Sequence, residues 1–244
     1  MIDAIFEDDS LLVLAKPPGQ TVNRAETTQN EVTLQDELER YLGISRAAPL
    51  RQDFAGRSGI VHRLDKETSG ILVVAKTQEA FENLQAQFKE RLVDKEYLTL
   101  AHGKTPEEGK IEAPLGRHPK FRMRFDVVPG GRESMTEYTR EAVYQPKLPD
   151  YPITQLPSYS LLRVHPLTGR THQIRVHLKH IGHPVVSDPL YLSPKTLKED
   201  LTFCPRLFLH AAALSFTHPA TNARMRFEAE LPDDLQKVLT ILQG

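Results

Sequence analysis

Apolar and polar positions along this chain follow two different periods, which predicts a mixture of strands and helices. Apolar segments at 2–6 and 11–15 flank a short polar turn and predict a β-hairpin. The run 71–75 is rich in β-branched residues and too short for a helix, so it predicts a buried strand. Residues 95–103 alternate with a period of two and predict a further strand.

Helical spacing of apolar residues predicts helices that begin near Thr33, Thr77, Thr171 and Pro232. Thr33 with Asp36 forms an N-cap signal, and Gly43 ends that helix. Two of the helices carry apolar stripes: Phe81, Leu84, Phe88 and Leu92 on the one after Thr77, and Leu235, Val238, Leu239 and Ile241 on the last.

The remaining strands are predicted within 111–144, where Pro129-Gly130-Gly131 forms a turn, and at 159–164, 207–216 and 224–229. Four prolines at 146, 149, 152 and 157 predict an extended surface connection. We do not interpret it as a domain linker, because no new pattern starts after it. Strands and helices mix without steady βαβ alternation, which predicts the α+β class.

The length and composition of the chain indicate how large its core can be and in which compartment the protein is expected. With 244 residues the chain can bury one large core or two small ones. No apolar run approaches the length of a membrane span, and the N-terminus does not resemble a signal peptide. The single cysteine, Cys204, cannot form an internal disulfide. We therefore expect a cytoplasmic protein that does not associate with membranes.

The net charge of −1 is low for a nucleic-acid binder, but the charges are segregated. Residues 115–125 and 160–183 each contain four Lys or Arg residues and no acid. Such local basic surfaces can attract a polyanion, although two solvated basic faces would have the same pattern.

The densest polar stretch, residues 62–70, leads directly into the buried strand predicted at 71–75. Asp65 therefore lies on a loop held by a rigid element, where catalytic groups are often found. An ordinary salt bridge would be the alternative role for a loop aspartate. The order of residues, His-Arg-Leu-Asp-x-x-Thr-Ser-Gly, resembles the catalytic motif of the RluA-type pseudouridine synthases.

Further segments resemble that family in the same order, over about residues 1–230. They are Lys16-Pro17-Pro18-Gly19, Lys95-x-Tyr97, Thr168 to Leu178, Asp188-x-x-Tyr191 and Leu209-His210-Ala211. Ser187 departs from the pattern, because glycine is expected before Asp188. The resemblance implies a pseudouridine-synthase-like α+β fold: a mixed, largely antiparallel sheet flanked by helices and loops, with the active-site cleft across the sheet. It also implies one catalytic domain over 1–244, without a separate N-terminal RNA-binding module.

The resemblance further implies a cofactor-free isomerisation of uridine to pseudouridine in RNA. The C1′–N1 bond breaks, the uracil turns, and C5 joins C1′, so that nothing is oxidised and no group is donated. No dinucleotide or P-loop motif is present. Four clustered histidines, His172, His177, His180 and His183, lack a cysteine pair or His-Glu-x-x-His, so we expect RNA contact or helix capping and no metal site.

Three residues take catalytic roles by resemblance. Asp65 would add to the sugar or assist departure of the base. Arg175 would keep that carboxylate ionised, although it could equally contact a phosphate. Tyr97 would stack on uracil and take the C5 proton, the alternative being a strand tyrosine packed in the core. For substrate and RNA binding we expect His62, Arg63, Lys120, Arg122, Arg170, His172 and Leu209, the last of which could also be a core leucine.

Two other functions compete with a synthase. A catalytically silent RNA-binding protein would have no use for Asp65, Tyr97 and Arg175. A kinase-like reading of His-Arg-Leu-Asp lacks the downstream Asn, the Asp-Phe-Gly and the Gly-rich loop. For the partner we expect ribosomal large-subunit RNA in preference to tRNA, and we expect the protein to act as a monomer.

Overall fold

The computed structural model describes residues 2–25, 31–43, 54–145 and 157–243. These residues group into two compact units, which contain 1–95 with 211–229 (unit 1) and 96–210 with 230–244 (unit 2). Both units mix strands with helices, as the α+β prediction requires. None of the helices in the described ranges is long and apolar enough to cross a membrane.

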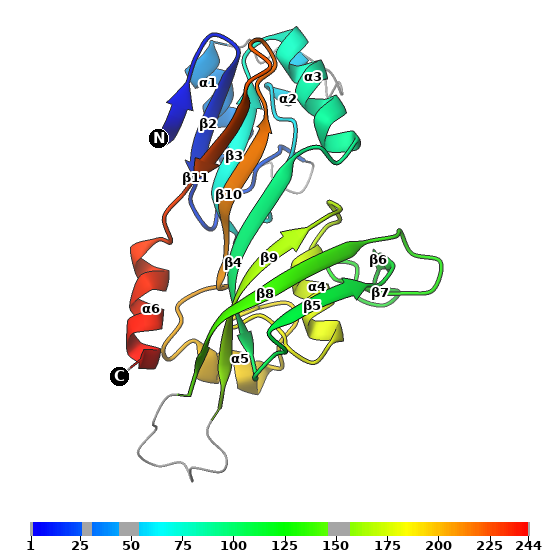
Figure 1. The fold of residues 1–244 in the computed structure, drawn as a ribbon, viewed down its shortest axis with the longest axis vertical. Coiled ribbons are helices and arrows are strands. Elements are labelled where there is room, and N and C mark those ends of the chain that lie inside the picture. Colours follow the sequence, from blue (N-terminus) through cyan, green and yellow to red (C-terminus); the bar gives the residue numbers. More distant parts are fainter. Residues whose placement is uncertain (1, 26–30, 44–53, 146–156, 244) are drawn as a thin grey trace. The chain divides into compact units, whose positions relative to one another are not determined.

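Unit 1 is built on a sheet in the order β1-β2-β3-β10, with β11 antiparallel to β10 (Figure 1). Its elements are β1 (Ala4–Glu7), β2 (Leu11–Lys16), α1 (Leu34–Leu42), α2 (Phe54–Arg57), β3 (Ser69–Ala75), α3 (Gln78–Lys89), most of β10 (Leu209–Thr217) and β11 (Arg224–Glu228). The predicted hairpin is confirmed, because β1 and β2 pair antiparallel.

Strand β3 is the centre of unit 1, and every one of its residues is buried. Its residues Ile71, Val73 and Ala75 join side chains of β2, α3 and β10 in one apolar cluster. Gly70 lies so close to β10 that an added Cβ would be 2.2 Å from the Ala211 carbonyl oxygen, at a φ of +117°. Only glycine fits there, which accounts for the glycine that ends the polar motif.

The helix signals of unit 1 are confirmed at their starts. Thr33 and Asp36 form a reciprocal capping box, and Gly43 adopts a φ of +66° after α1. Thr77 caps α3. The stripe on α3 was predicted one turn too long, because the helix ends at Lys89 and Leu92 is 53% exposed.

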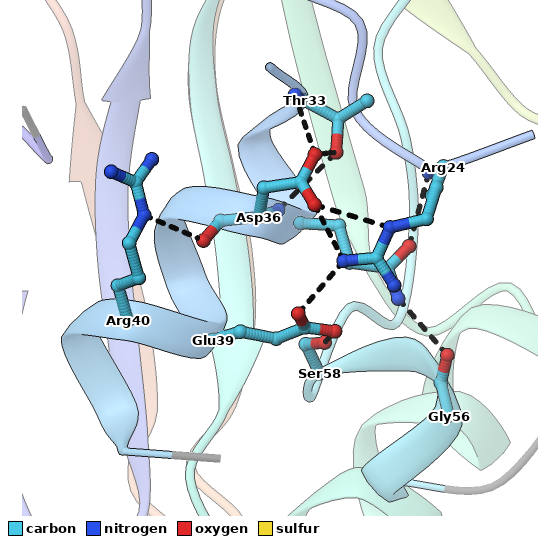
Figure 2. A network of polar contacts seen from close by, with 8 residues as sticks. Arg24, Thr33, Asp36, Glu39, Arg40, Gly56 and Ser58 are labelled. Carbon is cyan, nitrogen blue, oxygen red and sulfur yellow. Dashed lines mark hydrogen bonds and ion pairs between the residues drawn. The ribbon is translucent and has the colours of Figure 1, made fainter. Parts of the chain in front are cut away.

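A polar network joins α1, α2 and the segment before residue 26 (Figure 2). The Arg24 guanidinium donates to Asp36 at 2.6 Å and to Glu39 at 2.7 Å, and Ser58 donates to Glu39 at 3.2 Å. Burial opposes ionisation of Asp36, but hydrogen bonds from Thr33 and Arg24 lower its pKa to about 2. Ile60 then bridges to β3, so the network fixes the chain just before the polar motif.

The short helix α2 was not predicted from the sequence. Its four residues are too few to create a helical period, and so no sequence signal announced it.

Unit 2 has a sheet in the order β4-β9-β8-β5, in which each neighbouring pair is antiparallel, and a separate β6–β7 hairpin (Figure 1). Its elements are β4 (Asp94–His102), β5 (Glu108–Glu112), β6 (Leu115–Arg117), β7 (Phe125–Val127), β8 (Met135–Tyr144), β9 (Tyr159–Pro166), α4 (Gln173–His180), α5 (Pro194–Asp200) and α6 (Asp233–Gln243). The first residues of β4 belong to unit 1.

The proline-rich segment is not a boundary between the units. Strands β8 and β9 lie on either side of it in the sequence and pair with each other in the same sheet. Prolines 146, 149 and 152 themselves lie outside the described residues. On α6, Leu242 is buried and Ile241 is 57% exposed, which corrects the predicted stripe by one residue.

Candidate active site

Asp65 lies in a tight turn immediately before β3. The Thr68 N–H donates to the Asp65 carbonyl at 3.1 Å and closes the turn, and the Asp65 side chain is half-buried. Because β3 is entirely buried, the end of this turn cannot shift without disturbing the core of unit 1. The local fold therefore fixes the backbone of Asp65.

Lys16, the last residue of β2, holds the same turn from the other side. Its side chain is only 1% exposed, and its ammonium donates to the carbonyls of Pro17, Gln20 and Lys66 at 2.7, 3.0 and 3.0 Å. The Gly19 N–H donates to the Lys66 carbonyl as well, at 2.8 Å. Lys16-Pro17-Pro18-Gly19 thus anchors the residue next to Asp65, a role that sequence reasoning had not assigned.

His62, predicted to contact RNA, has intramolecular partners. Its Nε2 accepts from the Val73 N–H at 3.0 Å, and its ring stacks on Phe88 with the centroids 4.5 Å apart. Burial, with a smaller effect of the Lys95 charge, lowers the pKa of His62 to about 3. The ring is therefore neutral at pH 7, with its proton on Nδ1. Arg63 is exposed and makes no hydrogen bond or ion pair with another described residue.

Arg175 is buried on α4 in unit 2 and forms a two-bond ion pair with Asp188. Its Nε and Nη2 donate to the two Asp188 oxygens at 2.8 and 2.7 Å. Asp188 is fully buried and also accepts from the N–H groups of Leu190 and Tyr191. The guanidinium can therefore meet another carboxylate only through its other N–H groups.

Tyr191 is a further neighbour of Arg175. The guanidinium carbon lies 5.2 Å from the centre of the Tyr191 ring, in cation–π geometry. The Tyr191 hydroxyl accepts from the Phe125 N–H and hydrogen-bonds His172 Nδ1, both at 2.9 Å. Asp188 and Tyr191 are site residues to which sequence reasoning gave no role, although the spacing Asp188-x-x-Tyr191 was the available signal.

The surroundings of Ser187 explain how serine can replace the glycine that is expected before Asp188. Its φ is +55°, in the left-handed region where glycine carries no steric cost. The buried serine gains two hydrogen bonds, from its N–H to Asp200 and from its hydroxyl to the Cys204 carbonyl, each 2.7 Å long. The turn therefore keeps its geometry without glycine.

Leu209 belongs to an apolar cluster of unit 2 that also contains Ile174 and Leu178 of α4, and Tyr97 packs against this cluster. Tyr97 is half-buried, and Leu209 is 3% exposed. The structure thus brings together the helix of Arg175, the tyrosine and the leucine. Asp65 belongs to unit 1, so its ion pair with Arg175 stays a prediction.

The clustered histidines differ in their surroundings. His177 is fully buried, with Nδ1 2.8 Å from the Thr136 hydroxyl and Nε2 3.1 Å from both the Ser134 hydroxyl and the Ala113 carbonyl. Burial lowers its pKa. RNA contact or helix capping is therefore wrong for His177, which is a core residue. His172 precedes α4 at a φ of +56° and forms no capping bond.

Three predicted RNA-binding residues lie on two separate surface segments of unit 2. Lys120 and Arg122 are exposed between β6 and β7, where Phe121 and Met123 are 56% and 76% exposed. Arg170 is half-buried in the turn before α4, and its Nε donates to the Glu133 carbonyl at 3.2 Å. Among the described residues, no group of three His, Cys, Asp or Glu side chains could hold a metal ion.

The family model described as RNA pseudouridylate synthase matches residues 10–180. The chain belongs to the RNA pseudouridylate synthase family. A relative from Pseudomonas aeruginosa named "Ribosomal large subunit pseudouridine synthase D" is 36% identical over 250 residues, covering 99% of this chain and 72% of the relative. One from Chloroflexus aurantiacus, named "Uncharacterized RNA pseudouridine synthase", is 41% identical over 93% of this chain and 65% of its own length. The predicted family is thereby confirmed.

A solved structure of this family gives the same result for the fold. The protein "Human RNA Pseudouridylate Synthase Domain Containing 1" matches with a TM-score of 0.71 and 26% identity, over 95% of this chain and 84% of the human chain. The predicted pseudouridine-synthase-like fold is therefore confirmed. The family match includes Lys16, Asp65, Tyr97 and Arg175 and ends before Asp188.

Proposed function

We propose that this protein is an RNA pseudouridine synthase that isomerises specific uridines in ribosomal RNA. The observation that carries the proposal is Asp65, a half-buried carboxylate in a turn fixed between a fully buried strand and the anchored Lys66 carbonyl. Such a group is held ready for a reacting atom, as an enzyme requires and a simple RNA-binding protein does not. The names of ribosomal relatives support the choice of RNA, and tRNA is the alternative substrate.

In the proposed reaction Asp65 acts first, by adding to C1′ or by assisting departure of uracil. The detached base turns and C5 bonds to C1′, which breaks the bond to Asp65 where that carboxylate had added. C5 then loses its proton and N1 gains one. The product is therefore an isomer of uridine, so the residues need only position the base, remove one proton from C5 and deliver one to N1.

Arg175 and Tyr97 have complementary parts in this scheme. Arg175, already oriented by Asp188 and Tyr191, would use its remaining N–H groups to keep Asp65 ionised. Tyr97, half-buried against the apolar cluster that contains Leu209, would offer its ring to the uracil and its hydroxyl to the C5 proton. Leu209 would close the apolar side of the base pocket.

Arg63 supports a base-flipping step. A uridine in folded RNA must leave its stack before C1′ can be reached. Arg63 is exposed two residues before Asp65 and makes no hydrogen bond or ion pair with another described residue. Its guanidinium is therefore suited to fill the vacated place, while His172 and Arg170 would contact the displaced backbone. The enzyme would act as a monomer in the cytoplasm.

The segment between β6 and β7 is proposed as a phosphate-binding surface. Arg122→Ala and Lys120→Ala are each expected to weaken RNA binding and to reduce the slope of log K against log salt by about 1, because each removes one phosphate contact. Filter binding over a series of salt concentrations measures this slope. Lys237→Ala, an exposed lysine on α6, is the control and should leave it unchanged. An unchanged slope in Arg122→Ala would contradict the assignment.

The proposed function is tested by tritium release from RNA labelled at C5 of uridine. Purified protein is incubated, with chelator present, with large-subunit ribosomal RNA or with tRNA. Release from ribosomal RNA, with pseudouridine found at a few positions, is the expected result. No release from either RNA, despite binding, would make the protein a catalytically silent RNA binder.

A further inference from the structure

The hydroxyl of Thr68 is buried without a hydrogen-bond partner among the described residues. Thr68 is 2% exposed, and its Oγ1 is one of only two buried side-chain polar atoms in the described ranges for which no partner exists. Leaving such a group unpaired costs free energy of folding, so each case calls for an explanation. Its place in the chain suggests one.

Thr68 is the last residue of the turn that carries Asp65. The Thr68 N–H donates to the Asp65 carbonyl, so the two residues are the first and fourth of the turn, and their Cα atoms lie close together. Because the Thr68 hydroxyl has almost no exposed surface, neither solvent nor substrate reaches it directly. Its partner in the reaction must come from the protein.

We propose that Thr68 is a positioning residue whose hydroxyl donates a hydrogen bond to the Asp65 carboxylate when uridine is bound. This inference rests on the proposed function. One carboxylate oxygen, held by Thr68, would leave the other directed at the sugar. A hydroxyl bound to a carboxylate forms a short, charge-assisted bond. The Thr68 hydroxyl therefore has no hydrogen-bond acceptor in the free protein and gains one, the Asp65 carboxylate, when uridine is bound.

The chain offers a matched control in Thr105, the other residue with an unpaired buried hydroxyl. Thr105 is also 2% exposed, but it follows β4 in unit 2, and its backbone bonds to Ser160 and Arg140. If an unpaired hydroxyl were only a packing defect, the same substitution would have the same effect at both sites.

The test compares Thr68→Val, Thr68→Ser and Thr105→Val by steady-state and single-turnover tritium release and by thermal unfolding. Thr68→Val should melt at or above the wild-type temperature, because it removes an unpaired polar group. Its kcat should nevertheless fall about 10- to 100-fold, as expected for a misplaced reacting group, with KM changed by less than about threefold. Thr68→Ser keeps the hydroxyl and should keep kcat within about threefold, and Thr105→Val should leave kcat unchanged.

Several results would overturn the inference. They are a Thr68→Val enzyme with wild-type kcat, a Thr68→Ser enzyme as slow as Thr68→Val, or an equal loss in Thr105→Val. If Thr68→Val fails to fold, Thr68→Ala and Thr68→Ser provide a second pair that differs only in the hydroxyl, with the same expected contrast. A wild-type protein that releases no tritium would overturn the proposed function and this inference together, whereas an active wild type with an equally active Thr68→Val overturns only the inference.

Discussion

Asp65→Asn is expected to reduce pseudouridine formation by roughly 10³-fold or more, because it removes the only group assigned to act on C1′. The substitution keeps the size of the side chain and leaves the backbone bond between Thr68 and Asp65 in place. Folding and RNA affinity should therefore remain close to those of the wild type. Single-turnover tritium release with saturating protein measures the chemical step without interference from binding.

The control for this experiment is Glu67→Gln, which makes the same change of charge two residues away in the same turn. Glu67 is half-buried like Asp65, but it has no role in the proposed reaction. It should keep most of the activity. Equal tritium release from Asp65→Asn and the wild type would remove Asp65 from the mechanism, whatever the family resemblance.

Asp188→Asn is expected to have the largest effect on stability. It leaves the Arg175 guanidinium, which is 3% exposed, without its two-bond carboxylate partner. Removing one partner of a buried ion pair typically lowers the free energy of unfolding by about 3–5 kcal/mol, because the other charge stays buried and loses that partner. Urea denaturation followed by circular dichroism measures the change.

An exposed ion pair provides the comparison for Asp188. Glu199 lies 3.9 Å from Lys195 on α5, and both side chains are largely exposed. Glu199→Gln should change the free energy of unfolding by less than about 1 kcal/mol. If Asp188→Asn cost no more than Glu199→Gln, the pairing with Asp188 would not be what holds Arg175. A stable Asp188→Asn protein with normal kcat would also contradict the role of Asp188 in orienting Arg175.

Helix starts, the central strand and the family could be predicted from the sequence, because each depends on neighbouring residues or on motif order. Thr33 and Asp36 cap a helix through contacts three residues apart, and the run of β3 is buried because every residue in it is small or apolar. The sequence did not determine which residue is the last buried one of an apolar helical stripe. Leu92 and Ile241 fit a helical period, but the period does not say which turn faces the core.

The arrangement around the candidate site was decided by contacts between residues far apart in the chain. Lys16 reaches the Lys66 carbonyl across 50 residues, and His177 reaches the Ala113 carbonyl across 64. Arg175 was predicted to pair with Asp65, which stays a prediction, and only the fold shows that Asp188 binds the same guanidinium.

Sequence therefore determined which residue types are present and the local elements that carry them. The tertiary structure alone decided which lysine anchors the aspartate loop, which histidine is core and which hydroxyl is left unpaired. The physical reason is that burial and hydrogen-bond partners depend on how segments distant in the sequence pack together. A hydrophobic period of two or of 3.6 residues carries no information about that packing.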